Sequence, residues 1–346
     1  MTEPANDGVV VPAGSSALGE GRPATQFVRP TFAGLRPPSA SITSFEAPNV
    51  PPHPAAQRDP SRFAPRITQR RLLASGFAAL CLFATLIGVV VLAALLFDIF
   101  RDGAGKLNWA MLTGFPSRFA ERAGIGPALA GSAWVLLLTA LLAFPLGVGT
   151  AIWLEEYAPR NRWRRLIEMN IANLAGVPSI VYGILGLALF VRLMSLGRSL
   201  LAAGFTLALL ILPVIIIASQ EAIKAVPRTI RLGAYALGAT RWETIKHQIL
   251  PMALPGIMTG TILALSRAIG EAAPVILVGA LGFVAFIPTN PSDQYTVLPF
   301  QIFNWVSRPQ TAFHEVAAAA SIVLLVLLLS MSAVAIWLRN KYTRRS

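Results

Sequence analysis

The stretch Ile262–Gly279, ILALSRAIGEAAPVILVG, places an arginine and a glutamate inside a long apolar run. Arg267 precedes Glu271 by four residues, so in a continuous helix the two side chains would lie on one face. A charged side chain at the centre of a membrane helix costs about 2.5–3.5 kcal/mol on insertion scales. Two such residues in one run need an explanation, and the rest of the chain indicates what kind of protein carries them.

The composition is typical of a membrane protein. Hydrophobic residues make up 55% of the 346-residue chain and charged residues 13%, with a mean hydropathy of +0.62, whereas soluble domains carry about 25% charged residues. We therefore expect an all-α membrane protein. The single cysteine, Cys81, excludes an internal disulfide and a cysteine-based zinc site. The three histidines lack metal-binding spacing, so we expect no metal or cofactor in this chain.

Residues 1–65 differ from the rest of the chain, because they contain 12 of its 26 prolines and many serines, alanines and glycines. Such a segment buries too little apolar surface to offset the entropy of ordering it. We predict a disordered cytoplasmic tail at 1–65, followed by a membrane domain over 66–345. A cleavable signal peptide is not expected, since the first apolar run begins only at Leu72.

Six apolar runs follow, each close to the ~20 residues that a helix needs to cross a bilayer. The predicted spans are 72–97, 129–154, 171–190, 200–218, 255–281 and 316–338. The segments that connect the spans lie alternately on the two sides of the membrane. Those on one side carry 17 lysines and arginines, and those on the other side carry 7. The positive-inside rule places the side with 17, and with it both termini, in the cytoplasm. The net charge of +13 is thus mostly a topology signal, and we expect no nucleic-acid partner.

On a helical wheel, the run that contains Arg267 and Glu271 has one polar face and one apolar face. The residues on the side of Arg267 are Gly260, Ala264, Glu271 and Pro274, and those opposite are Ile262, Leu265, Ile269 and Ile276. We expect the polar face to meet the bundle interior or water. One interpretation is a pair that holds helices in register. The other is an anion path, in which Arg267 offers bidentate donors and Glu271 neutralises it while the path is empty.

The longest predicted cytoplasmic connection between spans is the segment 220–251. Thr240 and Glu243 have the spacing of a capping box, in which the threonine caps a helix and the glutamate hydrogen-bonds back. Gly238 can end the helix before it. We therefore predict two short helices that meet at Gly238, Ala239 and Thr240.

An apolar stripe follows on the second of these helices, since Trp242, Ile245 and Ile249 are spaced at i, i+3 and i+7. Pro251 is expected to end the element. A plain surface loop is one interpretation, but an exposed tryptophan stripe favours a soluble partner that covers it. A DNA-binding helix-turn-helix is disfavoured, because both ends of the segment are tied to membrane spans.

The sequence LGAYALGATRWETIKHQILP resembles the cytoplasmic loop of ABC importer permeases, whose pattern is Glu-Ala-Ala, three residues, Gly, nine residues and Ile-x-Leu-Pro. Leu232-Gly233-Ala234 stands in place of Glu-Ala-Ala and Gln248 in place of isoleucine. The resemblance implies that this loop docks on an ATPase subunit that binds ATP and magnesium, so this chain itself is not an enzyme. The expected ATPase-coupling residues are Gly238, Ala239, Thr240, Trp242, Glu243, Ile245 and Pro251.

The sequence SRAIGEAAP resembles the fifth span of phosphate permeases, with Ala272 where these usually carry threonine. The stretches EEYAPRNRWRRLIEMNIANLAGVPSIVYGILGLALF (Glu155–Phe190) and TVLPFQIFNWVSRPQ (Thr296–Gln310) are similar to the PstA family. The resemblance implies a six-helix type I ABC importer permease of the bacterial inner membrane, with Arg267 and Glu271 on the phosphate path. The implied partners are a PstC-like permease, PstB-like ATPase subunits and a PstS-like extracytoplasmic phosphate-binding protein.

Three other functions remain open. A related oxyanion such as arsenate has a shape and protonation close to those of phosphate. A secondary anion carrier would also place charges at mid-membrane, often with inverted repeats, but no convincing internal repeat is present. A membrane scaffold without transport activity would explain the spans and leave the charge pair and the loop without a purpose.

Overall fold

The computed structural model describes residues 67–343, and the tail predicted at 1–65 lies outside the described residues. Within the described part of the chain every regular element is helical. Five helices are long and apolar enough to cross a membrane, or six if one bent pair counts as a single span. The five are α1 (Ile67–Gly103), α3 (Gly126–Ile152), α6 (Leu200–Lys224), α9 (Leu250–Ile269) and α12 (Thr311–Thr343). The all-α membrane class is confirmed.

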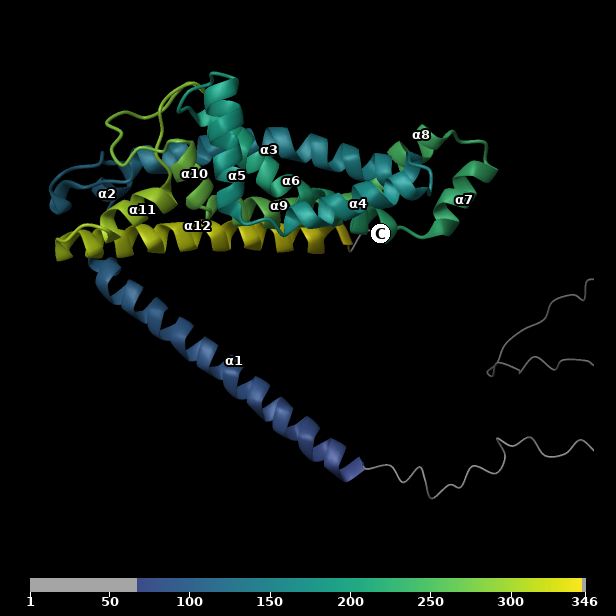
Figure 1. Ribbon diagram of the computed structural model, residues 1–346, viewed down its shortest axis with the longest axis horizontal. Helices are drawn as coiled ribbons and strands as arrows, with labels where there is room; N and C mark the ends of the chain where they lie inside the picture. The colour runs from purple at the N-terminus through teal and green to yellow at the C-terminus, as the bar shows by residue number, and fades with distance from the viewer. Residues whose placement is uncertain (1–66, 344–346) are drawn as a thin grey trace, which may run out of the picture. The chain divides into compact units, whose positions relative to one another are not determined.

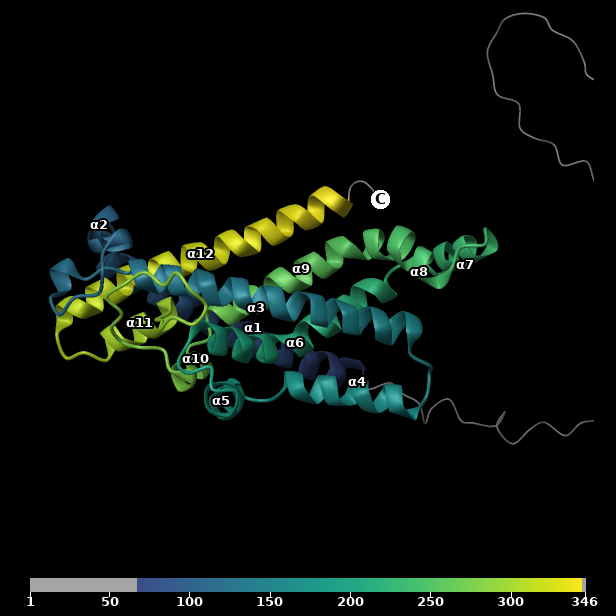
Figure 2. The same ribbon diagram turned by 90° about the horizontal axis from the view of Figure 1, so that it is seen from above.

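Helices α3, α6, α9 and α12 form the bundle, with α6 packed on both α3 and α9, and α12 packed on α9 (Figures 1 and 2). Glycines allow the closest of these approaches. A Cβ atom at Gly260 of α9 would lie 2.5 Å from the Cβ of Ala218 on α6, and one at Gly256 would lie 2.8 Å from Ala222. Small residues four apart on facing helices let their backbones approach, which is a common way to pack helices in lipid.

The third predicted span, 171–190, is sharply bent. Two helices, α4 (Arg162–Ala175) and α5 (Ser179–Gly186), meet there at an angle of 99°. Pro178 causes the break, because proline has no N–H to donate to the carbonyl four residues earlier. The carbonyl of Leu174 instead accepts from the Tyr182 hydroxyl at 2.8 Å. Helix α5, continued by the π-helix η6 (Leu187–Leu193), runs across the direction of the bundle (Figure 1).

The fifth predicted span, 255–281, is interrupted as well. Helix α9 ends at Ile269 with Gly270 as its C-cap, and a separate helix, α10 (Ala273–Val278), follows. Glycine and proline both disfavour a helix interior, and Pro274 cannot donate to the carbonyl of Gly270. The chain therefore breaks on either side of Glu271.

The two broken segments pack against each other, since α10 lies on α5 (Figure 2). A Cβ atom at Gly183 of α5 would lie 2.7 Å from the Cα of Pro274, so only glycine permits this contact. Helix α10 ends at Gly279 with φ +116°, a conformation that favours glycine. Glu271 thus lies in the turn between α9 and α10, and α10 packs on α5.

Short elements complete the two ends of the bundle (Figure 1). Helices α2 (Trp109–Thr113) and α11 (Leu298–Val306) lie at one end. Helices α7 (Arg228–Ala236) and α8 (Arg241–Thr244) lie at the other, and the π-helix η7 (Ile245–Ile249) joins α8 to α9. The candidate site at Arg267 lies between these two ends.

Candidate functional site

The membrane charge pair is present but loose. The Nε atom of Arg267 lies 3.6 Å from the Oε1 atom of Glu271. The arginine side chain is 60% exposed in the single chain, and the glutamate side chain is 20% exposed. This distance is at the outer limit of an ion pair and longer than a charge-assisted hydrogen bond of about 2.7–2.9 Å. Neither charge is therefore firmly held by the other.

The helix break changes how the pair is positioned. Arg267 lies in the last turn of α9, where the unpaired carbonyls of the helix favour a positive charge. Glu271 lies beyond the helix end, and its backbone N–H donates to the carbonyl of Ala268 at 3.2 Å. A turn brings Arg267 and Glu271 together, so the helical wheel of a continuous helix does not give the relative positions of their side chains.

The polar face was expected to meet the bundle interior or water, and in this chain by itself Arg267 is exposed. Leu265 and Ile269, placed on the opposite face, are buried in the core, while Arg267 is exposed. An arginine at membrane depth is costly in lipid and nearly always meets water or protein. The exposed side of α9 near Arg267 is therefore a surface that water or a partner subunit covers.

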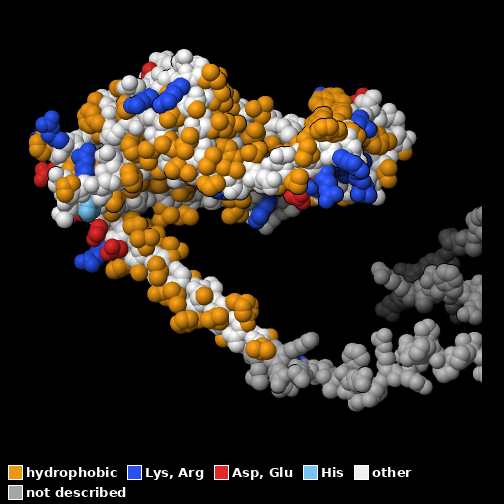
Figure 3. All heavy atoms as spheres, viewed as in Figure 1, with side chains coloured by type: hydrophobic (Ala, Val, Ile, Leu, Met, Phe, Trp, Pro, Cys, Tyr) orange, Lys and Arg blue, Asp and Glu red, His pale blue; other side chains and the backbone are white. Residues whose placement is uncertain are grey.

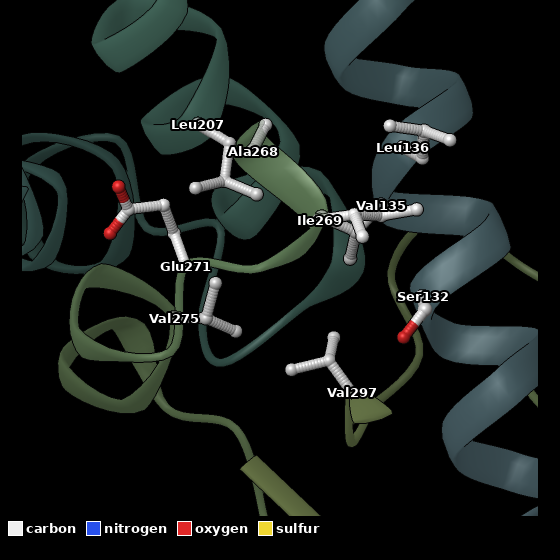
Figure 4. A pocket seen from close by; sticks show the side chains of 9 residues that line it. All are labelled: Ser132, Val135, Leu136, Leu207, Ala268, Ile269, Glu271, Val275 and Val297. Carbon is white, nitrogen blue, oxygen red and sulfur yellow. The ribbon is translucent and has the colours of Figure 1, made fainter. Parts of the chain in front are cut away.

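A narrow cavity lies beside Glu271, lined by Ser132, Val135, Leu136, Leu207, Ala268, Ile269, Val275 and Val297. Its volume is about 10 Å³, close to the least that admits one water molecule. Figure 4 shows Glu271 at one edge of this space, with its carboxylate pointing away from the α3 residues. This cavity is too small to hold an oxyanion.

The capping box in the loop between α6 and α9 is confirmed. The Thr240 hydroxyl accepts from the N–H of Glu243 at 3.3 Å, and the Glu243 carboxylate accepts from the N–H of Thr240 at 2.8 Å. Gly238 has φ +85°, which ends the preceding helix. Two short helices, α7 and α8, thus meet at Gly238–Thr240 as predicted, and Ala239 lies between the two caps.

The apolar stripe predicted on the second helix is only partly exposed. Trp242 is 58% exposed, but Ile245 and Ile249 are each 1% exposed and pack against Ile223 and Ile257 in the core of this chain. The Ile245 backbone N–H donates to the carbonyls of Arg241 and Trp242, so the helix is still regular at this residue, where the π-helical turn η7 begins. Ile245 anchors the loop and does not extend its surface.

Pro251 does not end the element, contrary to expectation. It lies in the first turn of α9, and helix continues from Arg241 to Ile269 without interruption. The π-helical turn immediately before it leaves this first turn free of the hydrogen bond that proline would otherwise break.

Three further apolar residues are exposed near Trp242, and the sequence analysis missed them. They are Leu232, Tyr235 and Leu237, and Leu237 is 91% exposed. We call these residues and Trp242 the apolar loop surface. The amphipathic pattern of α7 was the signal that could have revealed it. Basic side chains gather at the same end of the bundle (Figure 3).

Comparison with known proteins decides the family. Residues 143–344 match the model of the "binding-protein-dependent transport system inner membrane component" family. The chain belongs to this family. The permease YqgI of Bacillus subtilis (strain 168), a "probable ABC transporter permease protein", is 33% identical over 77% of this chain and 94% of its own.

PstA-named permeases are also similar over most of the chain. The "phosphate transport system permease protein PstA 1" of Mycobacterium tuberculosis (strain CDC 1551 / Oshkosh) is 30% identical over 88% of this permease and 98% of its own length. This permease is thus a PstA-family member, as the resemblance of Glu155–Phe190 and Thr296–Gln310 implied.

The fold of the permease has solved counterparts. The bacterial alginate ABC transporter, in complex with an alginate-bound periplasmic protein, includes a chain with a TM-score of 0.54 and 16% identity, over 77% of this permease and 93% of that chain. The fold is that of a type I ABC importer permease. In the described part of the chain no group of three or more His, Cys, Asp or Glu side chains could hold a metal ion.

Proposed function

We propose that this permease is the membrane subunit of an ATP-driven importer of inorganic phosphate. The observation that carries the proposal is the exposed Arg267 guanidinium at the end of a membrane helix, with Glu271 only 3.6 Å away and loosely held. An arginine presents a planar fork of donors that matches an oxyanion. Several relatives carry the name of phosphate transport permeases, which supports phosphate as the anion.

Glu271 adds a chemical preference in this proposal. Phosphate near neutral pH still carries a proton, and a carboxylate can accept a hydrogen bond from it, whereas sulfate offers no such proton. When no anion is bound, Glu271 neutralises part of the charge of Arg267. Arsenate has the same protonation and shape, and it remains the alternative substrate.

The apolar loop surface is the proposed docking site for the ATPase subunit. An exposed apolar patch on a membrane protein's soluble face marks a protein contact. Gly238, Ala239, Thr240 and Glu243 hold the turn, while Ile245 and Pro251 connect it to α9. In this proposal the loop and both termini are cytoplasmic, and the partner holds ATP and magnesium.

The opposite end of the bundle is the proposed contact for an extracytoplasmic, PstS-like binding protein. A groove of about 560 Å³ lies there, lined by Pro116, Ser117, Arg118, Phe119, Arg122, Phe283 and Arg308. Arginines on the outer side run against the positive-inside tendency, so topology does not explain them. Carboxylates on the binding protein are suitable partners for the three arginines of this groove. The PstC-like permease has a different proposed contact, on the exposed side of Arg267.

The test is uptake of labelled phosphate by the assembled transporter carrying Arg267→Gln or Trp242→Ala. We expect Arg267→Gln to assemble with the ATPase and to lose nearly all uptake, because the bidentate donor is gone. Trp242→Ala is expected to reduce ATPase co-purification. Normal uptake in correctly inserted Arg267→Gln protein would disprove the path, and uptake that persists without ATP would favour a secondary carrier.

A further inference from the structure

Two consecutive glutamates, Glu155 and Glu156, lie on the π-helical turn η5 (Trp153–Tyr157) that continues α3. Their side chains are 10% and 8% exposed, although each carries a charge. Charged side chains are rarely this buried unless they are paired. The two carboxylates bind residues from different helices, so this turn connects several elements at one point.

Glu156 is paired with Arg231 of α7. The Nε and Nη2 atoms of Arg231 donate to Oε1 of Glu156 at 3.1 and 3.0 Å. The same guanidinium donates to the carbonyls of Val226 at 2.7 Å and Ile223 at 2.9 Å, just at the end of α6. The Ile223 carbonyl lies in the last turn of α6, where it also accepts from the N–H of Ala225, and Val226 follows the helix end. One side chain thus joins α7 to both α3 and α6.

Glu155 forms the corresponding contacts with α4 and α6. Arg164 donates to both of its oxygens, at 3.2 and 3.1 Å, and the amide of Gln220 donates to it at 3.0 Å. Arg164 also donates to Glu168 at 2.8 Å. The η5 turn therefore fixes the ends of α3, α4 and α6 relative to one another, and Glu156 adds α7 to this group.

Helix α7 contacts α8 and η7, and the link to Glu156 adds a polar attachment. None of its residues is buried. Among the described residues no other α7 side chain has a hydrogen bond or an ion pair, so Arg231 provides its polar attachment. An open space of about 670 Å³ lies beside it, lined by residues that include Glu155, Glu156 and Arg231. Without Arg231, α7 has room to move.

Stability alone is a poor reason for such a pair, since apolar residues of similar volume often stabilise a protein at least as well as a buried ion pair. A rigid, directional link is what the guanidinium adds. We propose that Arg231 is a positioning residue that transmits movement of the apolar loop surface to α3 and α6. This inference rests on the proposed docking of the ATPase on that surface, and it assigns a role inside the chain to a residue that does not touch the ATPase.

The experiment compares uptake with ATP hydrolysis in the complete transporter, reconstituted in vesicles with its ATPase and binding protein. We expect Arg231→Gln and Glu156→Gln each to retain the ATPase and to hydrolyse ATP, while phosphate imported per ATP falls by about tenfold. The double variant is expected to be no worse than Arg231→Gln alone, because both changes break the same link. Arg231→Lys keeps the charge and part of the bonding, and it should restore part of the ratio.

The matched control is Arg165→Gln, which removes a nearby exposed arginine for which no polar contact is described; the ratio should not change. A normal ratio in Arg231→Gln would overturn the inference. Loss of the ATPase from Arg231→Gln would also overturn it, because Arg231 would then belong to the docking surface. The proposed function is tested separately: normal uptake in Arg267→Gln would disprove the phosphate path, and normal ATPase binding in Trp242→Ala would disprove the docking surface.

Discussion

Two arginine–glutamate pairs in this permease differ in almost every physical respect. Arg231 and Glu156 form two hydrogen bonds of 3.0–3.1 Å with side chains 18% and 8% exposed. Arg267 and Glu271 make one contact at 3.6 Å, and the arginine is 60% exposed. The first pair has backbone carbonyls as additional partners, whereas no other hydrogen bond of the Arg267 side chain is described.

The difference teaches that the same two residue types serve opposite purposes. A guanidinium that uses four of its five N–H donors within the chain, as Arg231 does, holds helices in place and has little left to offer a ligand. In the proposed function, a guanidinium with free donors on an exposed face exchanges its carboxylate for an anion. The interaction energy of the second pair is small, because water and distance screen it, and a small energy is what reversible binding requires.

The largest effect should come from removing the cation of the tight pair. Arg231→Met leaves Glu156 buried without a partner and frees two carbonyls, so the free energy of unfolding should fall by about 2–3 kcal/mol. Arg267→Met should change it by less than about 0.5 kcal/mol. Thermal unfolding of the detergent-solubilised complex measures both, with Arg165→Met as the control. Equal losses at the two sites would contradict the contrast.

A smaller effect is expected from Arg267→Lys on transport. Lysine keeps the positive charge but loses the planar fork of donors, so uptake should fall by about tenfold, equivalent to about 1.4 kcal/mol. Thermal stability should stay at the wild-type value, because the existing contact is weak. Initial rates over a range of phosphate concentrations measure the effect. Wild-type rates would mean that charge alone suffices at this position.

The smallest effect should come from Lys224, at the edge of the tight cluster. Its ammonium lies 2.9 Å from Glu221 and 3.7 Å from Glu155, but its side chain is 46% exposed. An exposed pair contributes about 0–1 kcal/mol, so Lys224→Ala should lower the unfolding free energy by at most about 0.5 kcal/mol. A loss as large as that of Arg231→Met would show that the whole cluster acts as one unit.

The elements that were predicted well have strong local signals. The capping box of Thr240 and Glu243 depends on atoms within four residues, and the long apolar runs require only hydrophobicity. The errors fall where the local pattern is broken. Pro178 and Gly270 interrupt apolar runs that hydropathy alone treats as continuous.

The burial of Ile245 was also missed, because it depends on packing against Ile223 and Ile257 of other helices. The Arg231–Glu156 link joins residues 75 positions apart, and no local pattern reveals such a pair.

The sequence by itself determined the membrane class, the helical content, the two-helix loop and the presence of a charge pair in the fifth apolar run. These follow from local chemistry, namely hydrophobicity, caps and proline. Only the tertiary structure decided which charges are held and which are exposed. That distinction depends on how helices distant in sequence pack, since burial and the number of donors around a carboxylate are properties of the assembled bundle.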